Sequence, residues 1–140
     1  MKRLILCLSV CLMSLSNAGA DTPPKAEAAA GRVYEMRTYY ANPGKMTALH
    51  ARFKDHTCRL FEKHGITLVG FWSPTDEKQA EDVMIYILSY PSKEAADKSW
   101  KAFREDPEWI KAKEASEKDG GLVKKAESLW LKGTPYSPLK

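Results

Sequence analysis

The sequence predicts an α+β fold in which one four-stranded antiparallel sheet carries two helices on one face. Strand patterns at 33–40, 66–72, 83–90 and 128–132 and helical patterns at 45–64 and from Ser92 onwards follow one another in the order β-α-β-β-α-β. That order is typical of a single sheet with both helices packed on the same side. The run at 83–90 is apolar at nearly every position, which indicates a strand buried on both faces.

Local signals place the ends of these elements. Asn42-Pro43-Gly44 predicts a turn after the first strand. Gly65 suits the left-handed residue that ends the first helix, because it has no Cβ atom to clash. Ser92 is the predicted N-cap of the second helix, and Pro107 predicts a break followed by a new helical turn. The segment 73–81 is predicted to be a polar loop.

Packing both helices on one face leaves the other face of the sheet open. If Val83, Ile85 and Ile87 line that face, they form a contiguous apolar patch, and patches of that kind mark interfaces. The simplest cover is the sheet of a second copy of the chain. We therefore expect a homodimer in which two sheets enclose a barrel.

Residues 1–20 have the pattern of a secretory signal peptide. Lys2 and Arg3 precede a nearly apolar run at 4–15, and Ala18-Gly19-Ala20 is a small-x-small cleavage pattern. The apolar run is shorter than the roughly 20 residues that span a bilayer. We expect an exported protein, periplasmic or secreted. A mitochondrial presequence is less favoured because the segment is neither amphipathic nor Arg-rich, and a lipoprotein signal would need a small residue before Cys11.

The remaining chain divides into a flexible leader at 21–31, rich in Ala, Pro and Lys, a domain at 32–132 and a C-terminal tail at 133–140. Cleavage after Ala20 would leave 20 Lys and Arg against 18 Asp and Glu, a net charge of +2. This small surplus is interleaved with acidic residues, so it gives no argument for nucleic acid or an anionic membrane surface as a partner. We expect no stable membrane insertion after cleavage.

Cysteine usage excludes an internal disulfide in the cleaved chain. Cleavage removes Cys7 and Cys11 and leaves Cys58 alone, so the domain has to be held together by its core. Cys58 is predicted to be an inert thiol near the surface. The alternative is an intermolecular disulfide or a redox role.

Four short motifs occur in order along the chain. They are Tyr34-Glu35-Met36-Arg37-Thr38-Tyr39, Pro43-Gly44-Lys45, the stretch from Glu62 to Trp72, and Asp106-Pro107-Glu108-Trp109. In this order they resemble the NIPSNAP domain over nearly its whole length. The resemblance implies a ferredoxin-like fold of the dimeric α+β barrel superfamily, whose members include cofactor-free monooxygenases, haem-handling enzymes and proteins with no known activity. It thus implies the fold more than the chemistry. Mitochondrial and vesicle-traffic roles of animal relatives are not carried over to an exported chain.

A polar row on the first strand is the main candidate site. Glu35 and Arg37 lie two residues apart, so they share one face of the strand, and Tyr39 continues the row. With Tyr34 and Met36 towards the helices, this row faces the barrel interior. A carboxylate, a guanidinium and a phenol would there bind and polarise a ligand. The alternative is a structural ion pair between Glu35 and Arg37 across the dimer.

His56 is the candidate acid–base residue. On an ideal helix it falls in the middle of the apolar stripe, and an imidazole titrates near neutral pH. A hydrogen-bonded core histidine is the structural alternative. His50, His56 and His64 lack the i, i+4 spacing of a helical metal pair and no HExxH motif occurs, so a metal site has no support. We expect no cofactor, since a haem ligand on this helix would have to reach through the sheet.

Aromatic residues supply the candidate ligand contacts. Trp72, Tyr86 and Trp130 are predicted to stack on a ligand, whereas Trp100 and Trp109 are predicted to pack in the core.

Together these observations favour an exported dimeric barrel that binds a small molecule or a partner and has no defined catalytic activity. The alternative is an enzyme, a cofactor-independent monooxygenase or an isomerase-like protein. It would act on a small aromatic or enolic substrate through the polar row and His56.

Overall fold

The computed structural model describes residues 31–139, so the predicted signal peptide and nearly all of the predicted leader lie outside the described residues. The strands pair antiparallel throughout, in the order β2-β3-β1-β4. In chain order the elements are β1 (Val33–Ala41), α1 (Met46–Arg52), the π-helix η1 (Phe53–Thr57), α2 (Cys58–Lys63), β2 (Thr67–Trp72), α3 (Glu77–Ala80), β3 (Val83–Tyr90), α4 (Lys93–Glu105), α5 (Pro107–Ser116) and β4 (Val123–Lys132). This is the predicted α+β fold.

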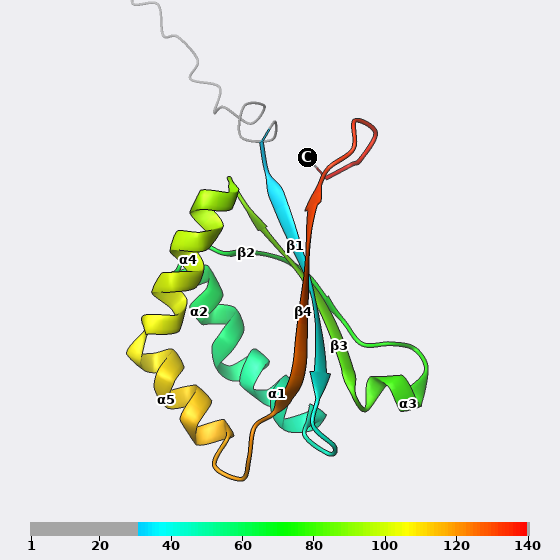
Figure 1. The fold of residues 1–140 in the computed structure, drawn as a ribbon, viewed down its shortest axis with the longest axis vertical. Coiled ribbons are helices and arrows are strands. Elements are labelled where there is room, and N and C mark those ends of the chain that lie inside the picture. The colour runs from blue at the N-terminus through cyan, green and yellow to red at the C-terminus, as the bar shows by residue number, and fades with distance from the viewer. Residues whose placement is uncertain (1–30, 140) are drawn as a thin grey trace, which may run out of the picture.

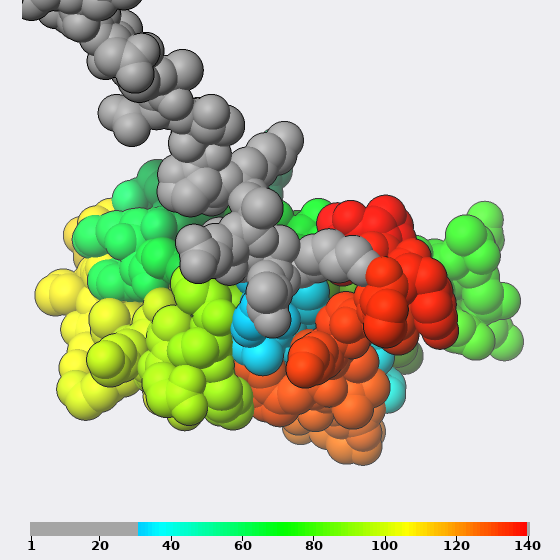
Figure 2. Space-filling view, turned by 90° about the horizontal axis from the view of Figure 1, so that it is seen from above, coloured from blue at the N-terminus to red at the C-terminus, as the bar shows by residue number. Residues whose placement is uncertain are grey.

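The helices other than α3 form a single layer against one face of the sheet. Helix α3 lies on the side away from that layer, near the end of the sheet where β3 begins (Figure 1). Figure 2 shows the α3 segment projecting from the body on the side away from α4 and α5. The core lies between the sheet and the helix layer, where Tyr86 and Leu88 of β3 meet Leu60 and Phe61 of α2, all of them 0–1% exposed.

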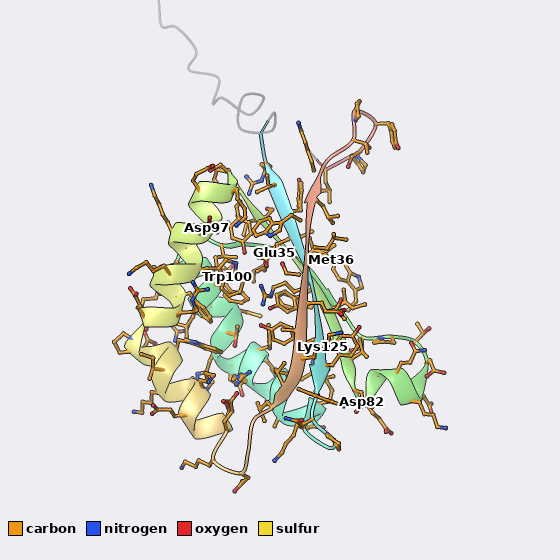
Figure 3. The ribbon with its side chains drawn as sticks, in the orientation of Figure 1. Glu35, Met36, Asp82, Asp97, Trp100 and Lys125 are labelled. Carbon is orange, nitrogen blue, oxygen red and sulfur yellow. The ribbon has the colours of Figure 1, made fainter. Side chains whose placement is uncertain are left out.

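The polar row of β1 faces the helix layer, which is the reverse of the predicted orientation. The indole Nε1 of Trp100 in α4 donates a hydrogen bond to Glu35 Oε2 at 2.8 Å, and the Arg37 guanidinium lies 4.7 Å from the Trp100 ring centroid. Figure 3 shows Glu35 and Trp100 on the helix side of β1 and Met36 on the opposite side. Strand alternation divides the residues of β1 into two rows, but it does not determine which row is buried. Hydrogen-bonding partners on distant elements place the row of Glu35, Arg37 and Tyr39 inside.

The other face of the sheet carries an apolar surface, which we call the open sheet face. The prediction that Val83, Ile85 and Ile87 lie on this face is confirmed, because they pair with the outward row of β1. Leu129 of β4 is 53% exposed there. The open sheet face consists of Tyr34, Met36, Thr38, Tyr40, Trp72, Val83, Ile85, Ile87, Leu129 and Leu131.

A π turn interrupts the first helix. The N–H of Cys58 bonds to the carbonyl of Phe53, five residues back, and the Thr57 hydroxyl donates to the Arg52 carbonyl at 3.2 Å. The wide turn accommodates an extra residue and rotates everything after it relative to an ideal helix. Thr57 is therefore buried and His56 is exposed. The predicted place of His56 in the apolar stripe is wrong because the prediction assumed uniform 3.6-residue winding.

Three further differences separate the structure from the sequence-based predictions. The last strand begins at Val123, five residues before the predicted start, since the charged residues of an edge strand conceal its alternation. The predicted loop at 73–81 contains the short helix α3, whose N-cap Asp76 accepts a hydrogen bond from the Gln79 N–H at 2.9 Å. Cys58 is half-buried and packs against the core, whereas a surface position was predicted.

Asp106 joins the ends of three helices. Its Oδ1 accepts the N–H of Glu108 at 2.7 Å and thereby caps α5, while its Oδ2 lies 2.8 Å from Lys63 Nζ and 2.6 Å from His64 Nε2 at the end of α2. Hydrogen bonds from Lys63 and His64 lower the pKa of Asp106 well below its usual value. The predicted break at Pro107 and the Ser92 N-cap of α4 are both confirmed.

Replacing Asp106 by Asn keeps a capping oxygen but removes the charge that binds α2. We expect the melting temperature at pH 7 to fall by several degrees. The pKa of Asp106 is lower in the folded chain than in the unfolded chain, where it is about 4. The wild-type carboxylate therefore stabilises the fold fully above pH 4, and this stabilisation is lost as the pH falls below that value. The difference in melting temperature between wild type and Asp106→Asn should therefore narrow between pH 4 and pH 2.

Circular dichroism melts over that pH range provide the measurement, with Asp97→Asn as the control because Asp97 is exposed and pairs only with Lys93. Equal melting temperatures for the two variants at pH 7 would contradict a joining role for Asp106.

Candidate functional site

A cavity of about 300 Å³ lies between the sheet and the helix layer, and we call it the aromatic pocket. Its volume is near the lower end of ligand sites, which run from about 300 Å³ upwards. An apolar cavity of about 150 Å³ holds one benzene ring, so the aromatic pocket has room for roughly two fused rings. Its lining is Tyr39, Arg52, Phe53, Thr57, Phe61, Trp100, Phe103, Trp109, Lys113, Glu117, Gly121, Val123 and Ala126.

The π turn builds one wall of this pocket. Arg52, Phe53 and Thr57 all line it, whereas on a regular helix these three positions would spread over about 140° of the circumference. π turns are rare and occur frequently at functional sites. The opposite wall comes from α4 and α5, where Phe103 and Trp109 pack with ring centroids 4.5 Å apart.

The Glu35 carboxylate is buried beside the pocket and hydrogen-bonded from four sides. At 2% exposure it accepts from Ser128 Oγ at 2.6 Å, Trp100 Nε1 at 2.8 Å and Tyr90 Oη at 3.1 Å, and it forms a 2.5 Å ion pair with Arg37. Burial opposes its ionisation, but the Ser128 hydrogen bond, the Arg37 charge and the Trp100 hydrogen bond together lower the pKa of Glu35 below its usual value. Glu35 is thus an ionised group with its acceptor capacity in use.

Arg37 lies between two rings that line the pocket. Its guanidinium carbon is 5.5 Å from the Tyr39 ring centroid and 4.7 Å from that of Trp100. Burial opposes its charge, yet the ion pair with the Glu35 carboxylate raises the pKa of Arg37 above its ordinary value. Its Nε is buried and has no hydrogen-bond partner among the described residues.

Tyr86 lies behind Tyr39 and Phe53, with ring centroids 5.2 Å from each. Its side chain is fully buried, and among the described residues its hydroxyl has no hydrogen-bond partner. Burial raises the pKa of Tyr86 well above its usual value, so the phenol stays protonated and is a donor. Buried donors without partners are uncommon, and an ordered water is one group that would supply the acceptor.

A second charged group lies on the other side of the pocket. Arg52 is 5% exposed, and its Nη1 donates to Glu117 Oε1 at 2.7 Å and to Ser116 Oγ at 3.3 Å. Lys113 Nζ lies 3.2 Å from the other Glu117 oxygen. Burial opposes ionisation of Glu117, but the Arg52 and Lys113 hydrogen bonds lower its pKa. The guanidinium of Arg52 also lies 5.3 Å from the Trp109 ring centroid.

The structure brings together four of the predicted site residues. Glu35, Arg37, Tyr39 and Tyr86 form one connected group, although they lie on the helix side of the sheet and not on the predicted barrel side.

The other three predicted residues lie elsewhere. Trp130 is beside Glu35 on β4 but packs on Tyr90 with ring centroids 5.8 Å apart, and it does not line the pocket. Trp72 lies on the open sheet face, and His56 is exposed in an outer hollow between η1 and α5.

Sequence reasoning missed the role of Arg52 and assigned Trp100 and Trp109 to the core only. On an ideal helix Arg52 falls about 60° from Leu49, at the edge of the apolar stripe. A charged residue at that position was the sequence signal that could have indicated a buried charged group. The two tryptophans do pack against the core, but they also form walls of the aromatic pocket.

Two other hollows lie in residues 31–139. One, of about 730 Å³, is an open groove between α1 and α3 lined by exposed groups such as Glu77 and Glu81. The other, of about 280 Å³, lies on the open sheet face between Ile87, Leu131 and Leu139 of the C-terminal tail. Over the same residues, no cluster of three His, Cys, Asp or Glu is placed to hold a metal ion. Nor does any helix in the described part of the chain have the length and apolarity to cross a bilayer.

Comparison with known proteins identifies the family. The NIPSNAP family model matches residues 34–138. The chain belongs to the NIPSNAP family. Among curated proteins, none matches it.

Solved structures similar to this chain share its fold. A NIPSNAP family protein of unknown function from Agrobacterium tumefaciens is 23% identical with a TM-score of 0.67, over 79% of this chain and 95% of that one. A second A. tumefaciens NIPSNAP protein is 19% identical with a TM-score of 0.68, over 78% and 99%. SnoaB, a cofactor-independent oxygenase from Streptomyces nogalater, is 12% identical with a TM-score of 0.53, over 78% and 99%. At these identities the likeness shows the fold alone.

Breaking the Glu35–Arg37 ion pair is expected to destabilise the fold. Glu35→Gln leaves Arg37 as an uncompensated buried charge, and breaking a buried ion pair from one side costs about 3–5 kcal/mol. We expect the free energy of unfolding to fall by that amount in urea titrations. The double variant Glu35→Gln/Arg37→Met should regain part of the loss, since it leaves no unpaired charge.

Glu127→Gln is the matched control, because Glu127 is a half-exposed carboxylate on β4. A Glu35→Gln variant as stable as this control would contradict a structural role for the pair.

Proposed function

We propose that this NIPSNAP protein binds a small planar aromatic molecule in the aromatic pocket and does so as an exported homodimer. The observation that supports binding most directly is the pairing of aromatic walls with unpartnered buried donors. Phe53, Trp100 and Trp109 offer ring faces, and the Nε of Arg52, which lines the pocket, is a buried donor without an acceptor among the described residues. Arg37 Nε and Tyr86 Oη are two further buried donors without acceptors there, and they lie behind the lining. Ligand sites commonly combine apolar walls with a few fixed polar groups in this way.

Binding without catalysis is favoured because the pocket offers no free general base. None of the residues that line it is a histidine, and the Glu35 carboxylate beside it already accepts hydrogen bonds from Ser128, Trp100 and Tyr90. A general base has to be within reach of the substrate proton and free to accept it.

The alternative function is a cofactor-independent oxygenase acting on a phenolic or enolic substrate. It is supported by the fold shared with SnoaB and by the Tyr86 and Arg37 donors, which would stabilise a substrate enolate. Oxygen consumption in the presence of a two-ring phenol, with no added metal or flavin, would favour this alternative over simple binding.

Dimer formation is supported by the open sheet face. Met36, Ile85, Ile87 and Leu129 form a contiguous apolar row across three neighbouring strands, and monomeric proteins rarely leave such a patch uncovered. A second sheet packed on it would bury these side chains. The dimer therefore places its interface on the opposite side of the sheet from the aromatic pocket.

Export is supported by the sequence of residues 1–20 alone. The basic start, the apolar run and the small-x-small site are those of a cleaved signal peptide. The protein would then act in the periplasm or outside the cell.

Filling the aromatic pocket is expected to abolish binding. Ala126 of β4 lines the pocket and is itself exposed, so Ala126→Phe adds a ring at the pocket without removing a core contact. Tryptophan fluorescence titration with 2-naphthol should show saturable quenching for wild type and a loss of affinity of at least tenfold for Ala126→Phe. Ala115→Phe, in the outer hollow beside His56, should bind like wild type. Equal affinity for all three proteins would contradict the placement of the site.

Charge on the open sheet face is expected to separate the dimer. Leu129→Glu puts a carboxylate at a residue that is 53% exposed on this face, whereas Ile110→Glu makes the same change at a residue that is 43% exposed on α5. Sedimentation velocity should show a dimer for wild type and Ile110→Glu and a monomer for Leu129→Glu at the same concentration. A wild-type monomer at tens of micromolar would contradict the proposed assembly.

A further inference from the structure

We propose that the ligand of the aromatic pocket is a planar aromatic acid whose carboxylate binds Arg52. This inference rests on the proposed binding function and adds the chemical class of the ligand. The group that carries it is the charged side of the pocket, formed by Arg52, Lys113 and Glu117.

Arg52 is placed and oriented for this contact by the π turn. It is the last residue of α1, and the Thr57 hydroxyl bonds to its carbonyl across the widened turn. Its guanidinium carbon lies over the Trp109 ring, at 5.3 Å from the centroid, so its charge is held against an aromatic wall. A ligand ring in the pocket would lie next to that wall.

The hydrogen-bonding capacity of Arg52 is incompletely used. A guanidinium has five N–H donors in a fixed fork. Nη1 donates to Glu117 and Ser116, while Nε is buried and has no partner among the described residues. An unpaired donor of a buried charged group costs free energy that a ligand oxygen would recover. The fork matches the geometry of a carboxylate, which accepts two parallel N–H bonds.

The side chains that line the pocket carry a net positive charge, which favours the binding of an anion. Arg52 and Lys113 share the single carboxylate of Glu117, at 2.7 Å and 3.2 Å, so this side of the pocket carries one surplus positive charge. The Arg37–Glu35 pair beside the pocket is balanced. Inside a partly dry cavity a surplus charge attracts an opposite charge more strongly than it does in water. One carboxylate on the ligand restores neutrality.

Glu117 has a defined role in this arrangement. In the unliganded chain it holds Arg52 in place, and it competes with a ligand carboxylate for the same donors. A purely structural Arg52–Glu117 pair and a ligand-binding Arg52 therefore predict opposite effects of removing the Glu117 charge. The structural role predicts no gain in affinity for any ligand, whereas the binding role predicts tighter binding of acids.

The test compares 2-naphthoate with its neutral analogue 2-naphthamide, two probes of nearly the same size and shape. Isothermal titration calorimetry on the wild-type chain at pH 7 should give at least tenfold tighter binding of the acid. Glu117→Gln should tighten binding of 2-naphthoate several-fold and leave 2-naphthamide within about twofold. Arg52→Gln should bind both probes equally and weakly.

Arg59→Gln is the matched control, because it removes the same charge from an exposed residue of α2 and should bind both probes like wild type. Should Arg52→Gln fail to fold, the Glu117→Gln comparison decides the question on its own.

The possible outcomes separate the two proposals. Equal affinity of wild type for the two probes, or unchanged or weaker acid binding in Glu117→Gln, would overturn the assignment of an acidic ligand while leaving the aromatic pocket as a binding site. Failure of wild type to bind either probe would overturn the acid assignment and count against the proposed function as well.

Discussion

The buried Glu35 carboxylate is the interaction on which the rest of this structure depends. It lies on β1, a central strand between β3 and β4, and its partners come from β3, β4 and α4 through Tyr90, Ser128 and Trp100. A buried charge is tolerated only when it is paired and hydrogen-bonded, so these elements have to meet at one point for the chain to fold. Because Glu35 is on the helix side, Arg37 and Tyr39 follow it there, and the apolar row of β1 is left on the open sheet face.

The same constraint explains why the candidate site lies where it does. The rings that surround Arg37 also form walls of the aromatic pocket, so the polar group and the cavity share their side chains. The π turn completes the pocket by directing Arg52, Phe53 and Thr57 to one side. Each helix that lines the pocket therefore has both a structural contact and a face towards the proposed ligand, while the sheet's other face is left uncovered by these helices.

Membership of the NIPSNAP family establishes the fold and leaves the chemistry to the site. The solved structures compared above share the architecture at 12–23% identity, and they include a cofactor-independent oxygenase as well as proteins of unknown function. A fold of this kind hosts unrelated activities, so the argument for function has to come from particular residues. In this chain Arg52 is such a residue, because its buried Nε lacks an acceptor among residues 31–139 and it shares the Glu117 carboxylate with Lys113.

The sequence by itself determined the order of the four strands and the main helices, the antiparallel sheet, the helix boundaries at Gly65, Ser92 and Pro107, and the family, because these depend on local periodicity and on short motifs. Only the tertiary structure decided which row of β1 is buried and where His56 points. A strand pattern has two equivalent faces until distant partners choose between them, and a helical wheel assumes regular winding, which the π turn breaks. The pairing of Glu35 with Trp100 across 65 positions, and the buried place of Arg52, likewise arise from packing between elements far apart in the chain.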